Sequence, residues 1–317
     1  MTATRRRGRR LVVAVAGALT VLCGPAGSLA SAHAPSAHSA TRARLALRLT
    51  TGTGSASCDP TASLRPSGPP VVTPGSFMAT IKARGYLIAG IDQSNYHFGF
   101  LNPLDGKIEG FDIDILHAIS AAIFGDPDKI KYVAVSDDQR IPAIQSGKVD
   151  IVAHAMTITC ARLQLVNFST VYFDAEQRVL VERNSTAASL TNVGNGKVCA
   201  PAGSAPLAYL RANSYVTVAV ANSTDCLMLL QEGKVVAIST DDAVLAGLMA
   251  QDPETKIIGA PLASAPYGLA ISLQHPDFVR FVNAVLAKLR ADGEWAAIYE
   301  HWIGTPAPAP PPANYRD

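Results

Sequence analysis

Between residues 77 and 304, short apolar runs alternate with longer segments in which apolar residues recur every three or four positions. A short apolar run bounded by turn residues is typical of a buried strand, and the longer spacing is typical of a helix. The alternation predicts an α/β fold, in which ligands bind beyond the carboxyl ends of strands. The predicted strands are 86–91, 131–135, 149–154, 177–182, 216–220, 235–239 and 267–272, and the predicted helices are 113–124, 140–147, 241–251 and 275–293.

The helix predicted over 275–293 has the clearest pattern. Its apolar side chains, from Phe278 to Leu289, share one face. Pro276 lies near its start and Gly293 just past its end, where each residue type is favoured. We expect the apolar face to lie in the core.

The first 30 residues have the pattern of an export signal. Five arginines lie between positions 5 and 10, an apolar run covers 11–22, and small residues follow. This predicts a cleavable signal peptide over 1–30 and an exported, extracytoplasmic protein associated with the cell envelope. Two alternatives stay open: a permanent anchor, for which the run is short, and lipidation of Cys23, although Leu22 is bulky where a lipoprotein signal has a small residue.

Two segments of biased composition flank the predicted α/β region. Residues 31–76 are rich in Ala, Ser, Thr, Gly and Pro, which predicts a flexible spacer. Cys58 lies within it and suggests that the segment is pinned somewhere. Residues 305–317 form a Pro-rich tail, which can build neither a helix nor a central strand.

Composition and charge exclude some classes of protein. Of the 317 residues, 48% are hydrophobic and 16% charged, which supports a well-filled core over most of the chain. The net charge is +2, and removing residues 1–30 takes away five arginines and no acid, which leaves −3. The mature protein is therefore not expected to bind nucleic acid.

Five cysteines are present, of which four remain if Cys23 is removed or lipidated. An even number in an exported chain favours two disulfides. No cysteine or histidine group has zinc-ligand spacing, so we expect neither a metal nor another cofactor.

Three stretches together resemble one family. They are 87–119, with GFDIDI; 140–173, with MTIT, then two residues and an arginine, and NFSTVY; and 226–248, with STDD. This combination is similar to the amino-acid-binding, family 3 extracellular solute-binding proteins of ABC importers. With CDPTASLRP at 58–66 and the Pro-rich tail, it most resembles the actinobacterial glutamine/glutamate-binding lipoproteins.

The resemblance implies a two-lobed periplasmic-binding-protein-like (type II) α/β fold with two hinge strands. Lobe 1 would hold 77–176 and 270–304, and lobe 2 would hold 177–269. The hinge would pass through 177–182 and 265–271 and close around the ligand. Of the cysteine pairs, Cys199–Cys226 is the one that such relatives keep, which leaves Cys58 for Cys160 by counting.

The family's carboxylate clamp matches Arg162, helped by Thr157 and the backbone of Ala155. A guanidinium suits this role because it binds a carboxylate through two parallel hydrogen bonds. The alternative for an isolated arginine is a solvated helix position. Asp241 matches the residue that meets the ligand's ammonium, and its alternative role is an ordinary helix N-cap.

Further positions concern the ligand's side chain. Arg140 matches an arginine that acidic-ligand binders tend to carry, which favours glutamate or aspartate, possibly their amides, since a second buried arginine implies a second anion. A solvated arginine at a helix start is the alternative. Gly203 and Ser204 would offer backbone N–H and hydroxyl groups, but Pro201 stands where several relatives have Lys, which puts a glutamine-specific contact in doubt.

Three residues near the first predicted strand complete the candidate site. Asp92 would accept from the ligand or hold Arg140. Tyr96 and Phe98 would pack on the ligand's methylenes, and for both a core position is an equal alternative.

Two other functions compete with delivery to an ABC permease. A membrane sensor could receive the ligand-bound protein in place of the permease, and nothing in the sequence separates these partners. A dehydratase-type enzyme on the same fold would need a catalytic acid in the cleft, and no nucleophile or metal motif is present. We expect a monomeric binding protein and not an enzyme.

Overall fold

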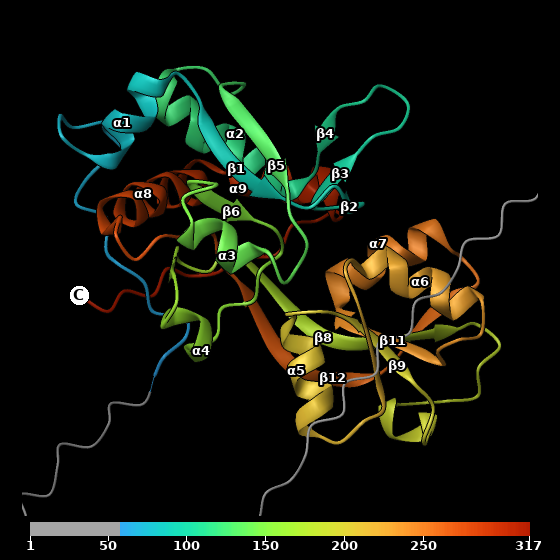
Figure 1. The fold of residues 1–317 in the computed structure, drawn as a ribbon. Helices are drawn as coiled ribbons and strands as arrows, with labels where there is room; N and C mark the ends of the chain where they lie inside the picture. The colour runs from blue at the N-terminus through green and yellow to red at the C-terminus, as the bar shows by residue number, and fades with distance from the viewer. Residues whose placement is uncertain (1–57) are drawn as a thin grey trace, which may run out of the picture. The chain divides into compact units, whose positions relative to one another are not determined.

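The computed structural model describes residues 58–317, and Figure 1 shows two lobes in this part of the chain. The predicted signal peptide, Cys23 and the spacer up to residue 57 lie outside the described residues. In residues 58–317, no helix is long and apolar enough to cross a membrane.

Lobe 1 contains a five-stranded sheet in the order β5-β1-β6-β13-β7, with β1 parallel to β5 and β6 and with β13 antiparallel to its neighbours. A small antiparallel sheet, β2-β3-β4, lies beside it. The elements are α1 Phe77–Arg84, β1 Leu87–Ile91, β2 Ser94–Asn95, β3 Gly99–Leu101, β4 Ile108–Glu109, α2 Phe111–Phe124, β5 Ile130–Ala134, α3 Arg140–Gln145, β6 Ile151–Ala153, α4 Cys160–Leu163, β7 Asn167–Phe168, β13 Ala270–Ile271, α8 Pro276–Asp292 and α9 Glu294–Trp302.

Lobe 2 contains a second five-stranded sheet in the order β10-β9-β11-β8-β12. Strands β9, β10 and β11 run parallel, while β8 is antiparallel to β11 and β12. The elements are β8 Phe173–Glu182, the 3₁₀ helix η1 Leu190–Val193, β9 Val198–Pro201, α5 Ala205–Ala212, β10 Thr217–Val220, α6 Ser223–Gln231, β11 Ala237–Asp241, α7 Asp242–Gln251 and β12 Thr255–Tyr267.

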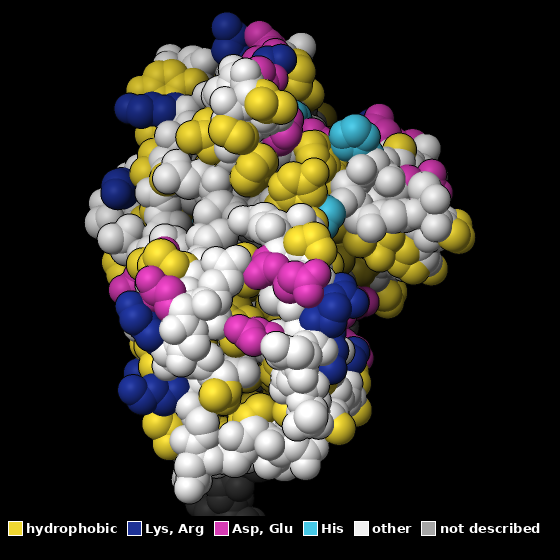
Figure 2. Space-filling model, turned by 90° about the vertical axis from the view of Figure 1, so that its right-hand side faces the viewer, with side chains coloured by type: hydrophobic (Ala, Val, Ile, Leu, Met, Phe, Trp, Pro, Cys, Tyr) yellow, Lys and Arg dark blue, Asp and Glu magenta, His cyan; other side chains and the backbone are white. Residues whose placement is uncertain are grey.

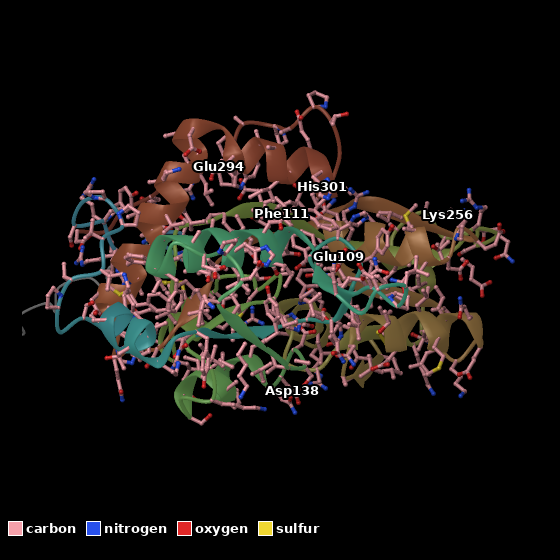
Figure 3. All side chains as sticks on the ribbon, turned by 90° about the horizontal axis from the view of Figure 1, so that it is seen from above. Glu109, Phe111, Asp138, Lys256, Glu294 and His301 are labelled. Atoms are coloured by element: carbon pink, nitrogen blue, oxygen red, sulfur yellow. A yellow bond between two sulfur atoms is a disulfide. The ribbon has the colours of Figure 1, made fainter. Side chains whose placement is uncertain are left out.

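The main core of lobe 1 is aromatic. Phe111, labelled in Figure 3 beside α2, packs against Tyr172, Phe173 and Trp295. Helix α8 adds its apolar face, as its pattern predicts, and ends at Gly293 with φ 84°. A residue without a Cβ adopts that left-handed backbone without strain, which is why the chain can turn directly into α9.

The two lobes are joined by the long antiparallel pair β8 and β12, as Figure 1 shows. The pairing runs from Phe173 with Tyr267 to Glu182 with Thr255, with a shift in register between Ile258 and Ala263. The predicted hinge strand 177–182 is therefore the second half of a longer strand. The predicted strand 267–272 is interrupted, since β12 ends at Tyr267 and β13 begins at Ala270.

The described part of the expected spacer, residues 58–76, is packed on lobe 1 rather than free. Ser63 is 2% exposed, pairs with Tyr315 of the Pro-rich tail, and accepts a hydrogen bond from Asn283 of α8. A buried hydroxyl needs such a hydrogen-bond partner, and the partners of Ser63 lie far away in the sequence. The composition of the segment therefore did not reveal that it is packed on lobe 1. The structure pairs Cys58 with Cys160 and Cys199 with Cys226, the same pairs that the sequence analysis expects.

Candidate functional site

A cavity lies between the lobes, beyond the ends of β1, β6 and β11. Lobe 1 contributes residues from the loops after β1, β5 and β6, and lobe 2 contributes the N-terminal ends of α5, α6 and α7. The cavity is lined by Asp92, Asn95, Asp137, Arg140, His154, Ala155, Thr157, Arg162, Ser204, Ala205, Pro206, Ser223, Thr240, Asp241 and Val244.

Arg162 lies on the short helix α4 and is 8% exposed. Its Nη1 donates to the carbonyl oxygen of Thr157 at 2.5 Å, and its Nη2 donates across the cleft to that of Gly203 at 2.9 Å. Burial lowers the pKa of Arg162 to about 9, and the charge of Arg140 adds to this. The guanidinium is still a cation at neutral pH, so it remains a suitable partner for a carboxylate.

Arg140 begins α3 and is 3% exposed, but its charge already has a partner. Its Nη2 lies 2.5 Å from Oδ1 of Asp137, and its Nε donates to the carbonyl oxygen of Asp137 at 2.9 Å. Its Nη1 donates to the carbonyl oxygen of His154 at 3.1 Å. Arg140 therefore lines the cavity as half of an ion pair.

Among the described residues of lobe 2 that line the cavity, Asp241 is the only one with an ionisable side chain. It is 4% exposed. It occupies the N-cap position of α7, yet its side chain makes no capping hydrogen bond. Oδ2 accepts from the hydroxyl of Tyr267 at 2.9 Å, while Oδ1 has no partner among the described residues. The structure thus shows an acceptor turned away from the helix end, which the N-cap alternative does not explain.

Burial raises the pKa of Asp241 to about 7, and the neighbouring Asp242 raises it further. The hydrogen bond from Tyr267 and the charge of Arg162 act in the opposite direction. A buried carboxylate with one unsatisfied oxygen is costly, and a cation placed against Oδ1 would remove that cost.

Three further predicted residues line the cavity, and a polar group of each already makes a hydrogen bond within the protein. Ala155, at φ 42°, donates its N–H to Oδ2 of Asp112 at 2.8 Å, and Thr157 supplies its carbonyl to Arg162. Ser204 caps α5, because its Oγ accepts from the N–H of Leu207.

Gly203 borders the cleft from lobe 2, and its position requires a glycine for two reasons. Its φ is 74°, and a Cβ there would lie 2.7 Å from Cα of Asp138, which Figure 3 labels. Gly203 therefore allows the two lobes to approach closely, and its carbonyl oxygen accepts the hydrogen bond from Arg162.

Asp92 lines the cavity as predicted, with its Oδ1 accepting from the N–H and Oγ of Ser94 and its Oδ2 3.9 Å from Nε2 of His154. The other two residues predicted beside it do not line the cavity. Phe98 is 0% exposed within the aromatic core, and Tyr96 is 44% exposed and packs on His97 and Phe100. Asn95, the last residue of β2, lines the cavity instead.

Sequence reasoning missed five polar residues of the cavity, which are Asn95, Asp137, His154, Ser223 and Thr240. Asn95 is 6% exposed, and its Oδ1 has no partner among the described residues. Asp137 could have been found, since it precedes Arg140 by three residues, a spacing at which opposite charges meet. Asn95 carried no such pattern, because asparagine is common in turns.

Other kinds of site find little support in the described residues. Among residues 58–317, no group of three or more His, Cys, Asp and Glu side chains could hold a metal ion. On the face drawn in Figure 2, lysines and arginines stand in small groups among acidic side chains, without a broad basic surface for nucleic acid.

Comparisons with known proteins agree with this geometry. Residues 87–305 match the model of the bacterial extracellular solute-binding proteins, family 3. The chain is 35% identical over 229 residues to the ABC transporter glutamine-binding protein GlnH of Bacillus subtilis, covering 71% of this chain and 84% of that protein. It is 34% identical to the glutamine-binding protein of Geobacillus stearothermophilus, covering 63% and 78%.

A solved structure of an ancestral arginine-binding protein bound to glutamine is 34% identical and aligns with a TM-score of 0.65, covering 70% of this chain and 99% of that one. These relatives and neighbours are solute-binding proteins, and so the chain is a binding protein and not an enzyme. With its two lobes, its hinge strands and a match over 87–305, this chain belongs to the family 3 bacterial extracellular solute-binding proteins.

Proposed function

We propose that this protein binds a free amino acid in the cavity between its lobes and delivers it to an ABC importer. The observation that carries the proposal is the pair of opposite buried charges facing one cavity from the two lobes. Arg162 of lobe 1 would bind the α-carboxylate, and the unpartnered Oδ1 of Asp241 in lobe 2 would accept from the α-ammonium. A zwitterion bridges the two and closes the hinge.

The charges around the cavity favour a neutral side chain on that amino acid. Two arginines and three aspartates line it, and these five side chains carry a net charge of −1 when all are ionised. Because Asp137 already neutralises Arg140, a second carboxylate on the ligand would enter a cavity that is negative before it arrives.

We therefore favour glutamine over the glutamate and aspartate that Arg140 alone suggested. A carboxamide can donate to the carboxylate of Asp137 or Asp92 and accept from Arg140, so both members of the ion pair keep a partner. Two relatives, from B. subtilis and G. stearothermophilus, are named as glutamine-binding proteins.

Glutamate remains the second candidate, since the guanidinium of Arg140 lines the cavity. A relative in Escherichia coli, 24% identical over 248 residues, is named as a glutamate/aspartate import protein. Rotation of Asp137 away from Arg140 would free this charge for a ligand carboxylate.

Calorimetric titration with glutamine, glutamate, asparagine, aspartate and arginine tests the proposal. We expect glutamine to bind most tightly, with glutamate at least about tenfold weaker, because an extra unpaired charge in a cleft costs more than 1.4 kcal/mol. Tighter binding of glutamate would reverse the side-chain assignment. Absence of binding by every amino acid would reject the proposal itself.

The expected partner is a membrane permease, and the expected state is a monomer. Both rival outputs, a permease and a membrane sensor, would contact lobe surfaces that come together on closure. Pull-down from membranes with and without glutamine, followed by identification of the captured protein, distinguishes them. Sedimentation of the purified protein tests the monomer.

A further inference from the structure

Two buried tyrosines lie side by side where the chain passes between the lobes. Tyr172 and Tyr267 are each 0% exposed, and the N–H of Tyr172 donates to the carbonyl oxygen of Tyr267 at 3.0 Å. Each hydroxyl donates to a buried aspartate: Tyr172 to Oδ1 of Asp112 at 2.5 Å, and Tyr267 to Oδ2 of Asp241 at 2.9 Å. The hinge therefore carries two tyrosine–aspartate pairs of the same chemistry.

The two pairs differ in what they join. Asp112 lies on α2 in lobe 1, and its second oxygen accepts from the N–H of Ala155, so both oxygens are satisfied within one lobe. Asp241 lies at the end of β11 in lobe 2, and the hydroxyl of Tyr267 is its one hydrogen-bond donor among the described residues. Only the second pair leaves an oxygen free.

Tyr267 is the last residue of β12, whose strand pairs in the lobe 2 sheet, but its ring lies in the core of lobe 1 and its hydroxyl reaches Asp241 of lobe 2. It packs edge-on against Phe98 and stacks on Phe173 in the lobe 1 core. Its backbone also pairs with Thr157, whose carbonyl holds Arg162. One short backbone bridge thus links the ring that orients Asp241 to the arginine on the opposite side of the cavity.

We propose that Tyr267 is a positioning residue that orients Asp241 and links its ligand-binding oxygen to closure of the lobes. The inference rests on the proposed function, because the ligand's ammonium is what Oδ1 would meet. When the lobes close, the hydroxyl satisfies Oδ2 and directs Oδ1 into the cavity. When they separate, Asp241 moves with lobe 2, away from a donor that stays with lobe 1.

The hydroxyl also has an electrostatic effect. A donor to a carboxylate favours its charged form, and here it opposes the burial that raises the pKa of Asp241 to about 7. The other charges acting on Asp241 are Asp242 and Asp137, which raise its pKa, and Arg162, which lowers it. Without the hydroxyl the pKa rises further, so Asp241 loses its charge at a higher pH.

The test is the substitution Tyr267→Phe in the full chain, which keeps the ring and removes the hydroxyl. We measure the Kd for glutamine by calorimetry between pH 5.5 and 8.5. We expect affinity at pH 7 to fall about tenfold, since a hydrogen bond to a charged group contributes this much. We also expect the pH at which affinity declines to move upward.

Tyr172→Phe is the matched control, because it removes an equally buried hydroxyl from an aspartate that does not line the cavity. Its melting temperature can fall, but the pH midpoint of binding should stay that of the parent protein. The proposal is overturned if Tyr267→Phe leaves both Kd and pH midpoint unchanged, or if Tyr172→Phe moves the midpoint equally.

A ligand-free measurement separates this inference from the proposed function. Carboxyl carbon NMR follows the titration of Asp241 with no amino acid present, and Tyr267→Phe should raise its midpoint. If the parent chain binds no amino acid, the proposed function fails while this readout still decides whether Tyr267 acts on Asp241. An unchanged midpoint of Asp241 rejects the role of Tyr267.

Discussion

The two lobes differ in how they hold the charged side chains that line the cavity. In lobe 1, both arginines are held by carbonyl oxygens, and Arg140 also has the carboxylate of Asp137. In lobe 2, Asp241 has a single hydrogen bond among the described residues, and that bond comes from Tyr267 at the hinge. Lobe 1 therefore presents the guanidinium of Arg162 in a fixed position, while lobe 2 presents a carboxylate with one oxygen unpartnered among the described residues.

This difference suggests an order of binding. In the proposed complex, Arg162 would bind the ligand's carboxylate while the lobes are still open, because this contact does not involve lobe 2. Asp241 would gain the ligand's ammonium as a partner only when lobe 2 closes. The free energy of pairing that buried carboxylate would then favour the closed state, as linkage requires of a ligand with different affinity for two states.

Asp241→Asn should give the largest effect, because it removes the charge that the comparison depends on. We expect Kd for glutamine to rise at least about thirtyfold, because losing one partner of a buried charged pair costs about 2–5 kcal/mol. Calorimetry measures it. Asp242→Asn is the control, since Asp242 instead accepts from the backbone N–H groups of Glu176 and Ala243. Equal losses in the two variants would contradict the special role of Asp241.

The pH dependence of stability without ligand should give the next largest effect. Burial raises the pKa of Asp241 to about 7 and that of Asp112 to about 6, so the folded chain binds more protons than the unfolded chain between about pH 4 and 7. Stability should therefore fall as pH rises through this window, by about 3–4 kcal/mol between pH 5 and 7 for the two groups together. Urea unfolding measures it.

Asp241→Asn should reduce that slope to the part contributed by Asp112 and raise the stability of the ligand-free protein at pH 8, because the unpaired buried charge is gone. Saturating glutamine should flatten it in the parent protein. A parent protein whose stability rises from pH 5 to 7 would show that these carboxylates are ionised at less cost than their burial indicates.

The substitution Asp137→Asn breaks the ion pair with Arg140 in lobe 1 and tests how that pair affects the choice of ligand. Removing the carboxylate frees the charge of Arg140, so glutamate should gain on glutamine by about tenfold. The ratio of the two Kd values, measured by calorimetry, decides it. An unchanged ratio would mean that Arg140 does not contact the ligand's side chain.

The disulfides should give the smallest change in binding. Cys58–Cys160 ties the N-terminal segment to α4, which carries Arg162, whereas Cys199–Cys226 is 0% exposed in the lobe 2 core. Replacing both Cys58 and Cys160 by serine should weaken glutamine binding a few-fold. Replacing Cys199 and Cys226 should chiefly lower stability, by about 2–5 kcal/mol.

Calorimetry and urea unfolding of the two double variants separate these effects. The distinction between the bridges would be lost if the lobe 2 variant, still folded, showed the greater loss of affinity.

Several features of the fold could be predicted from the sequence because they depend on neighbouring residues. Hydrophobic periodicity indicated the α/β architecture, and Pro276 and Gly293 marked the two ends of α8. The resemblance, carried by strings around Arg162 and Asp241, indicated two residues that the structure brings to one cavity. Local pattern was sufficient here, since a helix or strand buries the face that its own sequence makes apolar.

Only the tertiary structure decided how these groups are paired. Phe98 could have faced a ligand or the core, and its aromatic neighbours from β8 and β12 place it in the core. The composition of residues 58–65 predicted a flexible spacer. In the structure this segment pairs with Asn283 and Tyr315, which lie more than 200 positions away in the sequence. The hydroxyl of Tyr267 reaches Asp241 for the same reason: contacts across many residues depend on packing, which the periodicity of a single segment does not specify.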